Sequence, residues 1–292
     1  MPEQNQRPVV VVTGASRGIG RGIATVMGSH GCTVYVTGRS ERTGQTEDLP
    51  GTIYETAEAV TAAGGKGIPV VCDHADDAQT KAVFDQVADE QGRLDILVNN
   101  AAKVIDALTE PGPFWEKPLE LADVIDVGLR SAYVCSHYAA PIMVKQKHGL
   151  ILFTGSQGGQ YYFMGPAYGA HKAGEDKFAA DMGYELKDHG VAVVCIWCGG
   201  VLTDRTKRIF GANPEQYSGV EEMLETPEFT GHVMWALYND PKLMERSGQS
   251  WIGAELAIEY GIKDEGDRQP PNMREWLGVA PRRQPLPTGG SA

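Results

Sequence analysis

Short apolar runs alternate along the chain with longer segments in which apolar residues recur at helical spacing. The first run, 9–13, ends at a glycine, and the segment 19–30 that follows has the period of a helix. A strand, a tight turn and a helix are therefore expected at the start of the chain. The same criteria predict strands at 33–37, 68–72, 94–98, 150–154 and 191–197, and helices at about 53–63, 77–91, 119–147 and 166–187.

This alternation predicts the fold class. Strands joined through helices of this length need right-handed crossovers, which place the strands in parallel and the helices on both faces of the sheet. The expected fold is α/β, a doubly wound parallel Rossmann sheet in three layers, α/β/α. With 292 residues the chain has room for one large core. We assign 1–262 to a single domain and 263–292 to a proline-rich C-terminal tail.

Three segments interrupt the pattern. Residues 40–51 are polar and are expected to form a lengthened connection after the second strand. Residues 102–118 follow the fourth strand at its carboxyl end, where parallel sheets bind ligands, so they are expected to form one wall of a pocket. Residues 203–230 mix charge with aromatic side chains and are expected to form a mobile substrate lid. The tail has little apolar surface, so it is expected to be loosely ordered or packed on a neighbouring subunit.

The charge balance narrows the range of partners. Lys and Arg total 26 against 38 Asp and Glu, which gives a net charge of −12. Such a surface repels nucleic acid and anionic lipid. The sequence also has neither a bilayer-length apolar run nor an apolar signal-peptide core at its start. We expect a cytoplasmic protein with no nucleic-acid or membrane partner.

The cysteines fit a reducing compartment. They are five in number, an odd count, and most fall in apolar runs, which favours free thiols. Cys195 and Cys198 form a C-x-x-C pattern that a redox site or half of a zinc site would also show. Because residues three apart on a strand point to opposite faces, core packing is the favoured interpretation and no metal site is expected.

A glycine-rich turn follows the first strand. Absent side chains let a pyrophosphate approach the backbone, and the amino end of the following helix offers unpaired N–H groups. The spacing of the glycines differs from the usual dinucleotide fingerprint. A tight strand-to-helix turn without a ligand is the alternative. The candidate phosphate-binding residues are Gly14, Ser16, Arg17, Gly18, Ile19 and Gly20.

The cofactor preference is expected at the end of the second strand. An acidic residue there would bond the ribose hydroxyls of NAD, whereas a cation would favour the additional phosphate of NADP. This chain has Arg39 at that position and Arg17 in the glycine turn. Arginine meets phosphate with charge-assisted, two-pronged hydrogen bonds. The sequence therefore predicts NADP(H), and the alternative is that both arginines are solvated surface charges.

Tyr168 and Lys172 lie four residues apart, twelve residues after Ser156. A phenol ionises near pH 10, so a tyrosine that exchanges protons near neutrality needs a cation beside it. Residues four apart share a helix face, which places the Lys172 ammonium near the Tyr168 ring. Together with the glycine turn, this pattern indicates a hydride-transfer enzyme.

From about residue 9 to 262, the chain resembles the short-chain dehydrogenase/reductase family. The resemblance rests on the TGxxxGxG turn at 13–20, the Asn-Asn-Ala strand end at 99–101, and Ser156 with the YxxxK motif at 168–172. The segments 114–116, 127–130 and 260–261 resemble a subgroup typified by the animal member 1 of this family. The order of the motifs along most of the chain makes a chance match improbable.

The resemblance implies a role for each matching residue. Tyr168 would act as general acid in carbonyl reduction and as base in alcohol oxidation, with Ser156 hydrogen-bonding the substrate oxygen. Lys172 would lower the pKa of Tyr168 and hold the nicotinamide ribose. The remaining cofactor contacts would be Asp73 to the adenine, Asn99 and Ala101 on the adenosine side, and Val201 and Thr203 to the carboxamide.

Three positions depart from the family pattern. Gly128 stands where an asparagine usually completes a catalytic tetrad, which puts the proton relay in doubt. Because glycine keeps its backbone carbonyl, we expect activity to survive, and a much faster Gly128→Asn variant would show that the relay is impaired. Ala102 replaces a glycine, and Cys198 replaces a proline near the nicotinamide pocket, where thiol reagents would inhibit.

Aromatic and apolar side chains gather at 161–164 and at 114–115. They favour a largely apolar carbonyl or alcohol substrate, although a subunit interface or core packing explains them nearly as well. Family members commonly form homodimers or homotetramers, and the same is expected here. Two other functions stay open: an NADP(H)-binding regulator without turnover, and an epimerase or dehydratase of the same superfamily.

Overall fold

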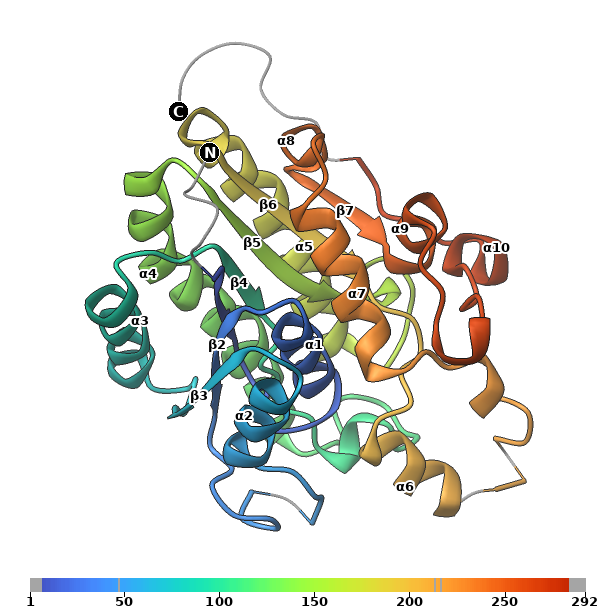
Figure 1. Ribbon diagram of the computed structural model, residues 1–292. Coiled ribbons are helices and arrows are strands. Elements are labelled where there is room, and N and C mark those ends of the chain that lie inside the picture. Colours follow the sequence, from blue (N-terminus) through green and yellow to red (C-terminus); the bar gives the residue numbers. More distant parts are fainter. Residues whose placement is uncertain (1–6, 47, 213, 216, 284–292) are drawn as a thin grey trace.

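Within residues 7–46, 48–212, 214–215 and 217–283, which the computed structural model describes, seven parallel strands form one sheet between two layers of helices (Figure 1). The strands are β1 (Val9–Val12), β2 (Thr33–Gly38), β3 (Lys66–Val71), β4 (Ile96–Asn99), β5 (Gly149–Gly155), β6 (Val191–Trp197) and β7 (Gln249–Ile252). The helices are α1 (Gly18–Ser29), α2 (Ile53–Ala62), α3 (Asp77–Gln91), α4 (Ser131–Gln146), α5 (Pro166–Leu186), α6 (Asp204–Ala212), α7 (Pro227–Tyr238), α8 (Leu243–Arg246), α9 (Gly253–Tyr260) and α10 (Met273–Leu277).

The strand order is β3-β2-β1-β4-β5-β6-β7. The chain winds outward from β1 to β3, returns to place β4 beside β1, and then winds outward the other way. This is the doubly wound Rossmann sheet that the sequence predicts. Loops leave β1 and β4 in opposite directions, so a crevice opens between their carboxyl ends, where such sheets bind ligands.

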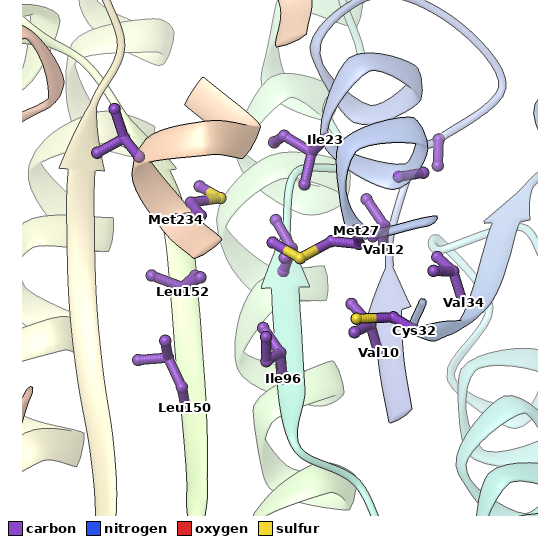
Figure 2. Packing of buried hydrophobic residues seen from close by; sticks show 14 of the residues in the cluster. Val10, Val12, Ile23, Met27, Cys32, Val34, Ile96, Leu150, Leu152 and Met234 are labelled. Carbon is purple, nitrogen blue, oxygen red and sulfur yellow. The ribbon is translucent and has the colours of Figure 1, made fainter. Parts of the chain in front are cut away.

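Alternate strand residues face two separate cores. Val10 and Val12 of β1 pack with α1, α2 and α7, as Figure 2 shows for Ile23, Met27 and Met234. The intervening β1 residues, Val9 and Val11, belong to the core formed with α3, α4 and α5. Because helices cover both faces, the central strands read as continuous apolar runs with every residue buried.

Local signals determine where several helices begin and end. The Thr52 side chain accepts a hydrogen bond from the Glu55 backbone N–H at 3.0 Å, and the Glu55 carboxylate accepts one from Thr52 at 2.9 Å, which caps α2. Asp76 caps α3, and Gly92 ends it in the left-handed conformation. The predicted bounds of α3 and β6 are correct, and the other predicted strands differ by one or two residues at an end.

Several elements differ from the prediction, and the helices α7, α8 and α9 after the sixth strand were not predicted. The expected helix 119–147 consists of a 3₁₀ turn at Leu119–Ala122, a π-helix at Val124–Arg130 and then α4. The strand β7 was not predicted, because its four residues, Gln-Ser-Trp-Ile, carry no periodic signal. It pairs with β6 and extends the sheet by one strand.

Parts of the predicted lid and tail pack against the domain. The segment 203–230 contains α6 and the start of α7, and its residues Glu225 and Phe229 are buried. In the predicted tail, Met273 of α10 is 3% exposed and joins the core that contains β5 and β6 residues. The sequence predicted a loosely ordered tail because the segment is polar and rich in proline. A single buried methionine is enough to pack it against the domain. Residues 284–292 lie outside the described residues.

Candidate active site

A cavity of about 760 Å³ is lined by residues that directly follow six of the strands, β1 to β6. It therefore lies at the carboxyl edge of the sheet, and α6 lies beyond the arrowheads of the strands in Figure 1. The predicted site residues that line this cavity are Gly14, Ser16, Arg17, Gly18, Ile19, Gly20, Arg39, Asp73, Ala101, Ser156, Tyr168, Lys172, Val201 and Thr203. Asn99 is not among them.

The glycine turn leaves the amino end of α1 facing the cavity. Gly14 has φ +63°, and a Cβ on it would lie 2.7 Å from the Ala101 Cα, so a side chain would both strain the turn and collide with the loop after β4. Arg17 at the N-cap makes no side-chain capping hydrogen bond, and the first turn holds no acidic residue. Unsatisfied N–H groups without negative charge fit a phosphate.

Two arginines lie at the end of the cavity beyond this turn. The Arg39 guanidinium is 3.7 Å from the Asp73 carboxylate, and both side chains are substantially exposed, at 46% and 37%. The Arg17 guanidinium donates to the backbone oxygens of Pro50 and Gly51 and to the Ser40 hydroxyl, at 3.0–3.1 Å. Arg17 thus holds Ser40, Pro50 and Gly51 in place. Among the described residues, the Arg39 guanidinium makes a single weak ionic contact, which a ligand could replace.

Asn99 lies outside the cavity, contrary to the expectation that it lines the adenosine side. Its side chain is buried and donates to the Ser136 hydroxyl at 3.1 Å. The neighbouring Asn100 lines the cavity instead and donates to the backbone oxygens of Thr13 and Gly14, at 2.8 and 3.1 Å. Successive residues of a strand point to opposite faces, and the sequence does not say which of two adjacent asparagines faces the ligand.

Ser156, Tyr168 and Lys172 meet on one wall. Ser156 follows β5 and accepts a hydrogen bond from the Gly158 N–H at 3.1 Å, so it also caps the 3₁₀ turn Gln157–Gly159. Tyr168 and Lys172 share one face of α5, and the Lys172 Nζ lies 5.7 Å from the centre of the Tyr168 ring. The Lys172 Nζ donates to the Thr154 backbone oxygen at 2.7 Å, which fixes the ammonium at the end of β5.

Opposing effects act on the Tyr168 pKa. Burial raises it above its ordinary value, and this is the largest effect. The Lys172 ammonium and hydrogen bonding with Ser156 act in the lowering direction, while the Glu175 carboxylate raises the pKa further. The sequence predicts the lowering effect of Lys172, whereas the effects of burial and of Glu175 emerge only from the packing. In the protein alone, the Tyr168 hydroxyl is therefore protonated at neutral pH.

Two residues beside Lys172, Glu175 and His171, were not predicted from the sequence. The Glu175 carboxylate contacts the Lys172 Nζ at 2.9 Å and the His171 Nε2 at 3.2 Å, and all three side chains are at most 8% exposed. Burial and Lys172 lower the His171 pKa, so the ring is neutral. The spacing of 171, 172 and 175 on one helix was the available signal.

Gly128 lies within the π-helix, directly against His171. A Cβ at this position would lie 2.3 Å from the His171 Cε1 and 2.5 Å from its Nδ1. The histidine ring thus occupies the space that the usual asparagine side chain would need. The single variant Gly128→Asn is therefore not a clean test of the proton relay, because the new side chain collides with the buried His171 ring.

The rest of the cavity is largely apolar. The loop after β4 contributes Leu108, α6 contributes Phe210, and α10 contributes Trp276. Tyr161 and Phe163 also line it, whereas Tyr162, Phe114 and Trp115 do not and are 81%, 62% and 71% exposed. The cluster of aromatic residues expected at the substrate is therefore divided between the cavity and the outer surface.

The sixth strand leads into Cys198, Val201 and Thr203. Burial raises the pKa of the Cys198 thiol to about 12, so it stays protonated at neutral pH. This argues against rapid inhibition by thiol reagents, because the thiolate is the reactive form. All five cysteines are buried and unpaired. In the described ranges, no cluster of three His, Cys, Asp or Glu side chains could hold a metal ion.

A model of the short chain dehydrogenase family matches residues 8–213. The chain belongs to the short-chain dehydrogenase/reductase family. Its members are oxidoreductases that use a nicotinamide cofactor and act on small molecules, so this chain is assigned to the oxidoreductases. The described part of the chain contains no helix with the length and apolarity needed to cross a bilayer.

The curated relatives include dehydrogenase/reductase SDR family member 1 of Mus musculus and of Homo sapiens. They are 40% and 39% identical to this chain over 267 residues, which cover 88% of this chain and 82% of each relative. A crystal structure of a short chain dehydrogenase from Mycobacterium thermoresistibile superposes with a TM-score of 0.75 at 24% identity. It covers 91% of this chain and 94% of that one, and supports the fold.

Proposed function

We propose that this protein is an NADP(H)-dependent oxidoreductase that interconverts a largely apolar carbonyl compound and its alcohol. The observation that carries the proposal is the convergence, on one cavity, of the open amino end of α1, two arginines and the Ser156–Tyr168–Lys172 group. The phosphates would bind at Gly14–Gly20 and the additional phosphate of NADP at Arg39. When bound, the cofactor supplies or accepts the hydride.

The protein's own residues would position the substrate and move one proton. In reduction, the Ser156 hydroxyl would hydrogen-bond the carbonyl oxygen, and the Tyr168 hydroxyl would donate its proton to that oxygen as the alcohol forms. In oxidation, Tyr168 would take the proton back. The Lys172 ammonium favours the ionised form of Tyr168 that reduction leaves behind.

The cavity lining supports the substrate class. Apolar side chains from the loop after β4, from α6 and from α10 line the same cavity as Tyr168. A ligand with one carbonyl group and an otherwise apolar body would bury its surface there while its oxygen reaches Ser156. A highly charged substrate would find few partners among these side chains.

A cofactor titration followed by a substrate screen tests the proposal. Binding of NADPH and NADH is measured separately by quenching of tryptophan fluorescence, and then ketones, quinones and aldehydes are screened by loss of nicotinamide absorbance. The proposal predicts tighter binding of NADPH and turnover of an apolar carbonyl. Preference for NADH contradicts the cofactor assignment. Tight binding without turnover of any carbonyl favours a cofactor-binding regulator instead.

A further inference from the structure

His171, Lys172 and Glu175 form a buried cluster on α5, and the proposed reaction assigns no role to His171 or Glu175. Glu175 is buried between two partners, with one carboxylate oxygen 2.9 Å from the Lys172 Nζ and the other 3.2 Å from the His171 Nε2. The Tyr168 ring lies on the same helix face, with its centre 6.3 Å from that of His171. Both partners of Glu175, Lys172 and His171, therefore lie beside Tyr168, the residue that would transfer the proton.

We propose that Glu175 and His171 are positioning residues of the catalytic centre. Glu175 holds the Lys172 ammonium behind Tyr168, and His171 holds Glu175 from the space left open by the glycine at 128. The inference rests on the proposed function, because it assigns these residues a part in the proton transfer by Tyr168. It makes Lys172 a member of a buried ion pair rather than an isolated cation.

The hydrogen bonds of His171 and Lys172 define this arrangement. A neutral His171 donates from Nε2 to Glu175, which leaves Nδ1 as a buried acceptor that has no hydrogen-bond partner among the described residues. Lys172 donates to Glu175 and to the Thr154 oxygen, so the ammonium has two fixed acceptors. A lysine held from two sides has little freedom to move relative to the tyrosine.

The fit between Gly128 and His171 connects the cluster to the π-helix. Gly128 approaches His171 so closely that any Cβ would overlap the ring. Gly174 lies on α5 one helical turn after His171. It also permits a close approach of α5 to the π-helix, since a Cβ on Gly174 would lie 2.5 Å from a Leu129 methyl carbon. A small residue at 128 and a ring at 171 therefore form one size-matched pair.

The charge on Glu175 has a predictable effect on proton release. Tyr168 and Lys172 titrate as a coupled pair, and a nearby carboxylate makes either group hold its proton more strongly. Removing that negative charge favours loss of the first proton, whichever group gives it up. The other titratable or polar side chains around the pair are His171 and Asp176 on α5, Ser156 after β5, and Cys195 and Cys198 on and after β6.

The first test is the pH profile of alcohol oxidation, measured with the alcohol that corresponds to the carbonyl reduced fastest in the screen. Glu175→Gln should move the acidic limb of kcat/KM to lower pH by about one unit, and Glu175→Asp should restore its position. Glu185→Gln, an exposed glutamate on the same helix, is the matched control and should leave the limb unchanged. An unmoved limb in Glu175→Gln overturns the inference.

The second test needs no substrate. Gly128→Asn should lower the Tm by about 5 °C through overpacking, and the double variant Gly128→Asn with His171→Ala should recover most of that loss. A Gly128→Asn protein as stable as the wild type would overturn the size-matched pair, as would a double variant no more stable than the single one. This comparison tests the contact between residues 128 and 171 even if Glu175→Gln does not fold.

The two proposals fail in different ways. Turnover that persists in Tyr168→Phe removes the proposed proton transfer, and the inference with it. Turnover that is lost in Tyr168→Phe, together with an unmoved acidic limb in Glu175→Gln, overturns only the role of Glu175 and His171.

Discussion

Replacing Arg39 with alanine should separate the two nicotinamide cofactors. Arg39 lines the cavity at the carboxyl end of β2, and its guanidinium lies 3.7 Å from the exposed Asp73 carboxylate. Contacts of this kind contribute little to folding, so the variant should keep its fold. What it would lose is a charge-assisted contact to the additional phosphate of NADP.

The size of the effect follows from the exposure of the side chain. Charge-assisted hydrogen bonds contribute about 1.5–3 kcal/mol, and the 46% exposure of Arg39 places this one at the lower end. A loss of about 1.4 kcal/mol raises the Kd for NADPH about tenfold. The Kd for NADH, which lacks the phosphate, should stay the same.

Fluorescence titration of both cofactors provides the assay. Arg21→Ala, an exposed arginine on α1, is the matched control for the loss of one positive charge. Arg17→Ala is less informative, because Arg17 also holds the 40–51 loop through several hydrogen bonds. Equal weakening of NADPH and NADH by Arg39→Ala, or no weakening of either, would refute the assignment of this end of the cavity to the phosphate.

Three further predictions concern the cavity mouth, a buried acid and the assembly. Asp106→Asn removes the negative charge that pairs with Arg205 and Arg208 of α6, so KM should rise about threefold at low salt and little at high salt, as steady-state kinetics will show. Burial raises the Glu225 pKa from 4.5 to about 8, so between these pH values the folded protein holds a proton that the unfolded chain releases, and the wild-type protein loses stability as pH rises from 4.5 to 8. Glu225→Gln should therefore gain Tm relative to wild type between pH 6 and 8, and an unchanged Tm difference would contradict this. Light scattering after size exclusion should give a dimer or tetramer, whereas a mass of about 31.5 kDa would contradict a homo-oligomer.

The features that the sequence predicted well depend on neighbouring residues. The alternation of apolar runs with helical segments determined the parallel sheet, because each strand is buried on both faces and each helix on one. The glycine turn was recognisable for the same reason, since it directly follows the first strand. Its position against Ala101 adds a tertiary reason for glycine at position 14.

The features that were missed depend on contacts between distant segments. The position of His171 is one example, because its ring fits only where α5 packs against the π-helix and Gly128 leaves room for it. The wall formed by α10 was missed because Met273 is isolated among polar residues and prolines. Which of two adjacent asparagines faces the cavity depended on the register of β4, which the motif alone does not give.

The central claim is that Tyr168 exchanges a proton with the substrate in the cavity that holds the cofactor. Turnover of the best carbonyl by Tyr168→Phe, compared with wild type at saturating NADPH, tests it most directly. The account predicts a loss of about 10³-fold in kcat with the Kd for NADPH unchanged, because the ring stays and only the hydroxyl is removed. Turnover at the wild-type rate would contradict it.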